Sequence, residues 1–468
     1  MENNLLKQRE FDLNIEEVLE NWEIFHALRE IIANALDEQV LTKTKKIEIK
    51  RENDFVIIRD FGRGLNYQHL TQNENEEKIN NPELVIGKFG VGLKDALATL
   101  NRHEIDVKIK TKYGDITLEK RKKHGFDDVV TLHALIDNPS EPDFEGTEFS
   151  LQGVTLNDLK MAKKLFLIFS DEKILEKTKY GEILEKTSSI SNIYINGVRV
   201  AEEENFLFSY NITSMTQSMR KSLNRERTNV GRSAYTDRIK SLLQLSCELS
   251  VAKMLVLDLE KFEIGTQHDE LKWNDVTVHA CKILNASKDV VFVTPREQNE
   301  RKHLLDYAKG DGSEIVVIPQ IIQEKIEGIE DTEGNTIRTV SQYEVEYNES
   351  FKFEFIPETE LTVSERKIFS NKDKILKIIG SKAVIIKEIK VSETIRVGTS
   401  ICGVAGMWVP SDRLIIIKRS ELSNLKSFSS TLLHEIAHAT SGCPDVDGHF
   451  EFELSKFLGI MSVEESIK

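Results

Sequence analysis

Residues 29–38 read REIIANALDE. On a helix, Glu30, Asn34 and Asp37 lie three and four residues apart and share one face. Apolar residues recur at helical spacing from position 15 to position 41, which predicts one long helix, or two, around this stretch. A carboxylate beside an amide suits a water-activating base next to an oxygen ligand for magnesium. A charged, solvent-facing helix surface is the alternative interpretation.

A second motif, RDFGRG, occupies residues 59–64. It places Asp60 at the end of an apolar strand and follows it with Gly62 and Gly64. A carboxylate in this position can accept a hydrogen bond from an exocyclic amine, and glycines let the backbone approach a flat ligand. A tight turn is the alternative interpretation.

A third and a fourth motif complete the series in the first 150 residues. IGKFGVGLKDAL (86–97) opens a helix with a glycine-rich stretch, where backbone amides bind phosphate and Lys88 or Lys94 adds charge. The glycines of this stretch are Gly87, Gly90 and Gly92. EGTEFSL then leads Gly146 and Thr147 into a strand. Both motifs also fit tight turns.

The order, spacing and content of these four motifs resemble the GHKL ATPases, the superfamily of gyrase, the ninety-kilodalton heat-shock chaperones, histidine kinases and MutL. The resemblance covers roughly residues 10–155, and EIIANALD and IGKFGVGL are especially similar to the heat-shock chaperones. It implies a Bergerat-type α/β sandwich that binds and hydrolyses ATP with Mg²⁺. The polar stretch TQNENEEKINNPE (71–83) would form the mobile lid of that site.

The same resemblance implies a role for individual motif residues. Glu30 would be the general base, Asn34 the magnesium ligand and Asp60 the residue that reads adenine. Asp37 would support the site, and Thr147 would contact the adenine side. The implied nucleotide-binding residues are Asn34, Asp37, Asp60, Gly62, Gly64, Gly87, Gly90, Val91, Gly92, Lys94 and Thr147.

The middle of the chain is similar to a heat-shock-type middle domain. SLNRERTNVGR (222–232) resembles the loop that supplies a catalytic arginine to the γ-phosphate, which implies this role for Arg225, or else for Arg227. A solvated basic turn is the alternative interpretation. A strand-helix-strand pattern over residues 289–319 predicts a parallel strand pair. The resemblance further implies a homodimer that forms through the ATPase domains when nucleotide is bound.

The C-terminal part carries HEIAH, which places His434 and His438 one helical turn apart and able to hold Zn²⁺. Glu435 is adjacent and can act as the catalytic carboxylate that polarises water. Gly442 suits the end of this helix. Upstream, RLIIIKR (413–419) is predicted as the edge strand on which an extended substrate pairs. A structural histidine pair, or no metal site, is the alternative.

A catalytic zinc site needs a third protein ligand, and DVDGHFEFELSKFLG offers His449, Glu451 and Glu453. We prefer Glu451, because apolar residues beyond it would bury the same helix face. These residues are Leu454, Phe457 and Leu458. The Glu451 run resembles the ligand helix of ImmA/IrrE-type peptidases, whereas His449 resembles the third ligand of SprT-like proteases.

The expected secondary structure rests on apolar patterning. Alternation predicts hairpins and strands at residues 45–60, 106–122, 129–136, 146–154 and 192–203. DRIKSLLQLSCELSVAKML (237–255) is predicted as one buried helix, and residues 324–350 as an exposed connection or hairpin.

The composition limits the classes of protein to which this chain can belong. The chain has 468 residues, of which 40% are hydrophobic and 30% charged, as in globular proteins of about three domains. The N-terminus lacks signal-peptide features, so we expect a cytoplasmic protein without a membrane segment. The four cysteines form no Cys-x-x-Cys pair and are expected to be free thiols. A net charge of −15 argues against nucleic acid as a partner.

These observations predict an α+β multidomain chain. Its parts would be a GHKL-type ATP-binding domain (1–155), an α/β transducer (156–350) and a zincin-like α+β domain (351–468). The predicted function is an ATP-regulated zinc metallopeptidase that uses ATP, Mg²⁺ and Zn²⁺ and cleaves a protein substrate. The alternative is a chaperone- or clamp-like ATPase with a structural or inactive zinc site; charge disfavours a MutL- or Morc-like DNA clamp. The architecture suggests a regulatory, stress or phage-defence role.

Overall fold

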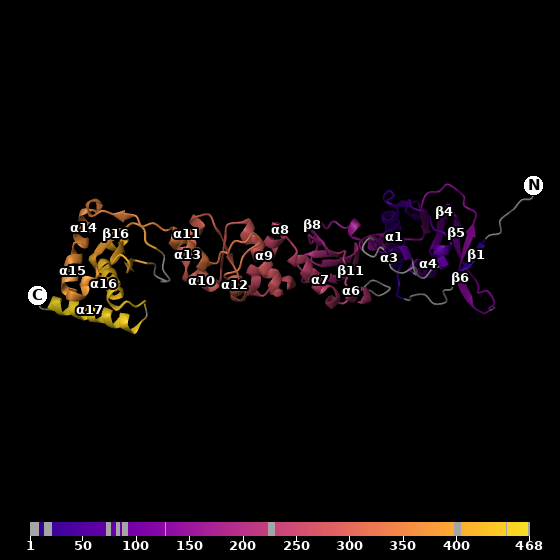
Figure 1. The fold of residues 1–468 in the computed structure, drawn as a ribbon. Helices are drawn as coiled ribbons and strands as arrows, with labels where there is room; N and C mark the ends of the chain where they lie inside the picture. The colour runs from indigo at the N-terminus through magenta and orange to yellow at the C-terminus, as the bar shows by residue number, and fades with distance from the viewer. Residues whose placement is uncertain are drawn as a thin grey trace, which may run out of the picture. The chain divides into compact units, whose positions relative to one another are not determined.

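The computed structural model describes residues 9–13, 21–71, 76–80, 85–86, 92–126, 128–222, 230–396, 404–445 and 447–466. The chain forms two compact units, Met1–Ile283 and Leu284–Lys468. Figure 1 labels their helices and strands. Both units mix helices with sheets, which confirms an α+β multidomain chain. The expected boundaries at 155 and 350 lie inside these units and stay predictions.

The first unit begins with a seven-stranded sheet in the order β1-β6-β5-β4-β7-β3-β2. All its neighbouring strands are antiparallel. The strands are β1 Arg9–Asp12, β2 Glu48–Glu52, β3 Phe55–Arg59, β4 Asp106–Thr111, β5 Gly114–Lys122, β6 Val130–Asp137 and β7 Thr147–Gln152. The β2–β3 and β4–β5 hairpins and the two later strands are confirmed.

Helices α1 (Ile24–Thr42), α4 (Gly92–Arg102) and α5 (Leu156–Lys163) pack with this sheet. One buried apolar cluster includes residues of all three helices and of the sheet. Of the helix expected within residues 15–41, α1 confirms the part from Ile24 onward; residues 21–23 are not helical, and residues 15–20 lie outside the described part of the chain. Helix α5 extends the same core beyond β7. Two short helices, α2 (Gln68–Thr71) and α3 (Glu76–Asn80), lie between β3 and α4 in the chain.

A five-stranded sheet follows in the order β11-β10-β12-β9-β8, with β10 and β12 parallel. Its strands are β8 Ile174–Thr178, β9 Gly181–Leu184, β10 Ser191–Ile195, β11 Val198–Glu203 and β12 Ser209–Ile212. The expected hairpin at residues 192–203 is confirmed as β10–β11. The accompanying helices are η1 Leu167–Phe169, α6 Gln217–Ser222, α7 Arg232–Gln244, α8 Leu249–Leu259, η2 Glu260–Ile264, η3 Asp269–Lys272 and α9 Asn274–Ser287.

The prediction of a single helix over residues 237–255 is wrong, because α7 ends at Gln244 and α8 begins at Leu249. The carboxylate of Glu176, on β8, accepts hydrogen bonds from the Cys247 backbone amide (2.7 Å) and from the Ser246 hydroxyl. A carboxylate at this position satisfies amides at the start of α8. The partner lies about seventy residues away in the sequence, so local periodicity does not reveal the break.

The second unit begins with the last residues of α9, and the parallel strands β13 (Val290–Val293) and β14 (Glu314–Val317) follow. Helices α10 (Pro295–Glu300) and α11 (Lys302–Gly310) connect them, which confirms the strand-helix-strand prediction. Helix α12 spans Gln320–Ile326.

The prediction for residues 324–350 is wrong over its second half, where α13 (Val340–Ser350) forms a helix. The Thr339 hydroxyl caps this helix by accepting from the Gln342 amide, 3.3 Å away. Val340 and Tyr343 are buried with residues of α11. Tertiary burial of one side of α13 therefore outweighs its polar composition.

The rest of the second unit is a four-stranded sheet in the order β15-β16-β18-β17, with helices. The strands are β15 Phe355–Ile356, β16 Glu388–Ser392, β17 Gly406–Val409 and β18 Leu414–Lys418. The helices are η4 Glu358–Glu360, α14 Val363–Phe369, α15 Asn371–Ile379, η5 Gly380–Ile385, η6 Arg419–Ser423, α16 Leu425–Ser441 and α17 Gly448–Ser466. The prediction that RLIIIKR is an edge strand is wrong: β18 pairs with both β16 and β17, and β17 lies at the edge.

Two further expectations concern the whole chain. Over the described ranges, no helix has both the length and the apolar composition needed to cross a bilayer. Cys247, Cys281 and Cys443 are free thiols, as expected, and Cys402 lies outside the described residues.

Candidate functional site

Helix α16 places the HEIAH histidines side by side. The Asn424 side chain caps the start of the helix by accepting from the Ser427 amide, 2.9 Å away. His434 and His438 lie one turn apart, and their Nε2 atoms are separated by 3.1 Å. Gly442 ends the helix with a φ of 69°, a left-handed conformation that favours glycine.

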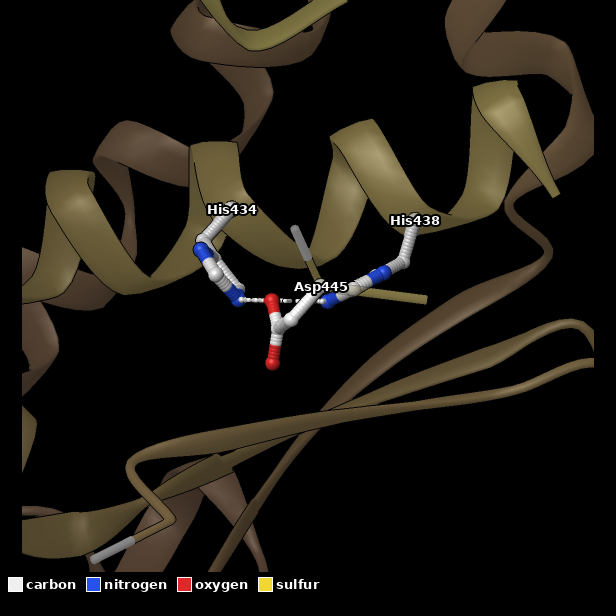
Figure 2. A group of neighbouring side chains, drawn as sticks. All are labelled: His434, His438 and Asp445. Carbon is white, nitrogen blue, oxygen red and sulfur yellow. Dashed lines mark hydrogen bonds and ion pairs between the residues drawn. The ribbon is translucent and has the colours of Figure 1, made fainter. Parts of the chain in front are cut away.

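Asp445 returns to the histidine pair three residues after this glycine (Figure 2). Its Oδ1 atom lies 3.1 Å from His434 Nε2 and 3.2 Å from His438 Nε2. Within the described residues, these three side chains form a group whose ligand atoms all lie within 4.8 Å of one another. The sequence prediction missed Asp445; its position three residues after a helix-ending glycine is the signal that could have revealed it.

The donor set of this group fits a zinc ion. Two ligands of one tetrahedral zinc, each about 2.0–2.1 Å from the metal, lie about 3.3 Å apart. The separations of 3.1–3.2 Å here are close to that value. His438 Nδ1 lies 2.8 Å from the Cys443 carbonyl oxygen, a contact in which Nδ1–H donates and Nε2 keeps its lone pair for a metal. Burial lowers the pKa of His434, which favours its neutral, metal-binding form.

Glu435 is buried in the same pocket, a cavity of about 1370 Å³ that both histidines, Asp445 and Trp408 also line. Burial raises the pKa of its carboxyl to about 8. Strand β17 passes close to this side chain: a Cβ atom on Gly406 would lie 2.8 Å from Glu435 Cγ. The pocket therefore combines three potential metal ligands, a buried carboxylate and a sheet edge.

Of the three residues predicted as the third ligand, only Glu451 lines this pocket. Glu451 lines the pocket but does not belong to the group of three ligand atoms, so its role stays a prediction. Glu453 forms an ion pair with Lys382, and the backbone amide of His449 donates to Asp447 (2.8 Å). The expected burial of Leu458 is wrong, because this side chain is 54% exposed.

Helix α1 places Glu30, Asn34 and Asp37 on one face, which the spacing predicts. Glu30 is buried beside Arg29, whose Nη2 lies 2.9 Å from Glu30 Oε1. Gly92, the first residue of α4, lies directly against this carboxylate, since a Cβ atom there would be 2.4 Å from Glu30 Oε2. The structure thus brings the last glycine of the third motif to the first motif.

Lys78, on α3, contacts two of the predicted site residues. Its Nζ donates to Asn34 Oδ1 (2.9 Å) and to Asp37 Oδ2 (2.7 Å). The other Asp37 oxygen accepts a hydrogen bond from the backbone amide of Ile86. The sequence prediction missed Lys78, which is a single cation within the acidic stretch expected to form a lid. An ammonium group therefore occupies the place between the amide and the carboxylate.

Asp60 and Thr147 lie side by side at the ends of β3 and β7. Asp60 Oδ1 accepts from the backbone amides of Gly62 (2.9 Å) and Thr147 (3.3 Å). Burial raises the pKa of this carboxyl to about 6. Gly64 has a φ of 86°, which requires the conformational freedom of glycine. The second and fourth motifs therefore form one local structure.

The remaining predicted residues divide into two groups. Lys94 is half-buried on α4. The residues that lie outside the described part of the chain are Gly87, Lys88, Gly90, Val91, Arg225 and Arg227.

Comparison with known proteins relates the chain to two proteins of Mycoplasma pneumoniae. One is 39% identical over 244 residues, which are 51% of this chain and 98% of that protein. The chain belongs to the family of this protein. The other is 23% identical over 337 residues, or 68% of this chain and 95% of that protein. Each is named only as an uncharacterized protein. Residues 157–249 match the family described as Mycoplasma pneumoniae MPN635 N-terminal domain.

The segment that matches this family model runs from α5 to the start of α8. It contains the whole five-stranded sheet. The group of His434, His438 and Asp445 lies outside this segment, and so do the four motifs of the first unit. In the sequence, the match therefore lies between the four motifs and this group and includes none of their residues.

Gly146→Ala is expected to disrupt the contact between Asp60 and Thr147. Gly146 has a φ of 81°, and a Cβ atom there would lie 2.0 Å from the Asp60 carbonyl oxygen. Left-handed strain and a backbone clash add, so the opening free energy of β3 and β7 should fall by about 4 kcal/mol or more. Hydrogen exchange of the amides in these strands measures this quantity.

Gly125→Ala is the matched control for this prediction. Gly125 has nearly the same φ, 83°, but its Cβ atom would meet no atom within 4 Å. We expect the opening free energy of β3 and β7 to fall by at most roughly 1–2 kcal/mol, because left-handed strain acts alone. Equal protection of β3 and β7 in both variants would contradict the close approach of Gly146 to Asp60.

Proposed function

We propose that the chain is an ATP-regulated zinc metallopeptidase. The observation that carries the peptidase part is the meeting of His434, His438, Asp445 and buried Glu435 in one cavity. The ATPase part is supported by the neighbouring positions of the GHKL-like motif residues around α1, β3 and β7. Zinc, when bound, would act as a Lewis acid towards the peptide carbonyl and lower the pKa of water.

The residues of the second unit have separate tasks in this proposal. His434, His438 and Asp445 would hold the metal. Glu435 would take a proton from the attacking water on its carboxylate and pass it to the leaving amine nitrogen as the C–N bond breaks. Glu435 lines the same cavity as the three ligands, so its carboxylate lies where it can make both transfers.

Strand β17 is the candidate surface for the substrate backbone. In the described part of the chain it pairs with β18 on one side only. An extended peptide can add to such an edge as a further strand. Gly406, Met407 and Trp408 of β17 line the same cavity as Glu435, so a peptide bound there would pass the carboxylate.

The first unit would bind ATP with Mg²⁺ through the motif residues. Asp60 would accept a hydrogen bond from the adenine amine, and Asn34 would offer its amide oxygen to Mg²⁺. Glu30 would act as the general base towards the attacking water. Lys78 Nζ now donates to the same Asn34 oxygen. Magnesium binding at Asn34 would therefore require Lys78 to move towards the phosphates or away from the site.

Hydrolysis of a peptide bond needs no ATP for its energetics, so ATP would govern access, assembly or substrate unfolding. A ligand changes a conformational equilibrium only through different affinities for its states. A homodimer formed through the ATP-binding parts, with a protein as substrate, is consistent with the GHKL resemblance and is part of the proposal.

Fragment analysis in cells tests the whole proposal. The wild-type chain, Glu435→Gln, Glu30→Ala and the double variant would be expressed at equal levels, and new protein N-termini would be mapped by mass spectrometry. We expect some fragments to appear only in the wild type, where the carboxylates of Glu30 and Glu435 are both present. Identical fragment patterns in all four strains would contradict an ATP-regulated peptidase and favour a chaperone- or clamp-like ATPase.

A further inference from the structure

The turn of the β10–β11 hairpin reaches from the five-stranded sheet to the segment before the glycine-rich motif. Asn196 occupies this turn in a left-handed conformation, with a φ of 47°. Its side-chain Nδ2 donates to the backbone carbonyl of Val85, 3.0 Å away. Val85 is buried, with 3% of its surface exposed. The contact joins residues that are 111 positions apart in the sequence.

The Val85–Ile86 segment is also held from the direction of α1. The Ile86 amide donates to one carboxylate oxygen of Asp37, and the other oxygen accepts from Lys78. Gly87 follows Ile86 directly in the chain. The two residues before the glycine-rich stretch are therefore fixed between Asp37 on one side and Asn196 on the other.

The backbone of the turn has its own anchors within the first unit. The Gly197 carbonyl accepts from the Leu167 amide (2.8 Å), and the Gly197 amide donates to Asn211 Oδ1 (2.9 Å). The Asn196 amide donates to the Ile212 carbonyl (3.0 Å). The hairpin therefore does not depend on the Asn196 side chain for its shape, and the bond from that side chain to Val85 links the five-stranded sheet to this segment.

We propose that Asn196 is a positioning residue that couples the nucleotide site of the first unit to the five-stranded sheet. The coupling rests on the proposed ATP site. Binding of nucleotide at Asn34 and Asp37 would alter the position or rigidity of Val85–Ile86. The hydrogen bond to the Val85 carbonyl would carry that change to β10–β11. Thermodynamic linkage makes this coupling reciprocal. If bound nucleotide favours one arrangement of the hairpin by a given factor, that arrangement binds nucleotide more tightly by the same factor.

Asn196→Gly tests this role with little backbone strain, because glycine adopts a positive φ without a steric cost. Asn53→Gly is the matched control: Asn53 has a φ of 52° at the turn between β2 and β3, and its side chain is exposed. Both full-length variants lose an asparagine side chain from a left-handed turn position. Only the first loses a contact with the segment before the glycine-rich motif.

Without nucleotide, hydrogen exchange at Ile86 should accelerate roughly fivefold in Asn196→Gly, as expected for the loss of one hydrogen bond. Asn53→Gly should match the wild type. With Mg·ATP, exchange across residues 191–203 should change at least threefold in the wild type and in Asn53→Gly. In Asn196→Gly this response should disappear even when ATP is bound.

Steady-state kinetics separate positioning from simple loss of structure. Asn196 does not contact substrate in this proposal, so its removal should raise the KM for ATP roughly fivefold and leave kcat unchanged. An unaltered ATP response of residues 191–203 in Asn196→Gly would overturn the coupling. If the wild type binds no ATP, the proposed function fails. The nucleotide-free comparison then decides the positioning role: faster exchange at Ile86 supports it, and unchanged exchange overturns it.

Discussion

Glu435→Gln is expected to lower peptide hydrolysis about a thousandfold or more while bound zinc is retained. Glutamine fills nearly the same volume in the buried position of Glu435 and keeps an oxygen that can accept a hydrogen bond. It cannot take a proton from water, and general-base catalysis contributes roughly 10²–10⁴-fold. Hydrolysis of fluorescein-labelled casein with Mg·ATP present, together with metal analysis of the same samples, measures both quantities.

Two further variants accompany this prediction, one as a matched control and one as a test of the metal ligands. Glu453→Gln makes the same substitution on α17, where the carboxylate pairs with Lys382, and should leave hydrolysis and zinc content unchanged. Asp445→Ala should reduce the zinc content, because Asp445 contacts both histidines. Zinc-loaded Glu435→Gln with wild-type hydrolysis would exclude Glu435 as the base and remove the peptidase from the proposal.

The sequence predicts those features that depend on neighbours close in the chain. The common face of Glu30, Asn34 and Asp37 follows from helical spacing, and the closeness of His434 and His438 follows from the same rule. The β2–β3, β4–β5 and β10–β11 hairpins follow from alternation and from their turn residues. In each case a single element of regular structure contains the whole pattern.

Features made by distant segments are missed. The break between α7 and α8 depends on Glu176 of another strand. The contact of Lys78 with Asn34 joins a short helix to α1 across more than forty residues. Asp445 is missed for a different reason. It is near in sequence, but it reaches the histidines from the chain beyond Gly442, where α16 has ended. The apolar pattern after Glu451 draws attention to that residue instead.

Gly62, Gly92 and Gly146 show how sequence and structure complement each other. The motif patterns identify Gly62 and Gly92 as glycines where backbone approaches a ligand, and Gly146 as a glycine that leads into a strand. In the structure, a Cβ atom on each would collide with the protein itself: with Glu38, Glu30 and Asp60, respectively. These glycines therefore bring the motif segments together, and that role would be needed whatever the site binds.

Glu30→Gln is expected to lower ATP hydrolysis roughly 10²–10⁴-fold and to leave ATP binding within about threefold of the wild type, since the loss is that of a general base. Glu30 lies tightly against Gly92, so the isosteric glutamine preserves the packing where alanine would leave a gap. Phosphate release and binding of a fluorescent ATP analogue measure the two quantities.

Glu119→Gln is the matched control, because Glu119 is also paired with an arginine close in sequence, Arg121, but lies exposed on β5. It should leave both quantities unchanged.

The Glu30→Gln variant also decides whether the two candidate sites communicate. If ATP turnover governs the peptidase, casein cleavage with Mg·ATP must differ between Glu30→Gln and the wild type. Cleavage at the wild-type rate in a variant that binds but does not hydrolyse ATP would show that turnover does not control the zinc site, and nucleotide binding alone would have to supply any regulation.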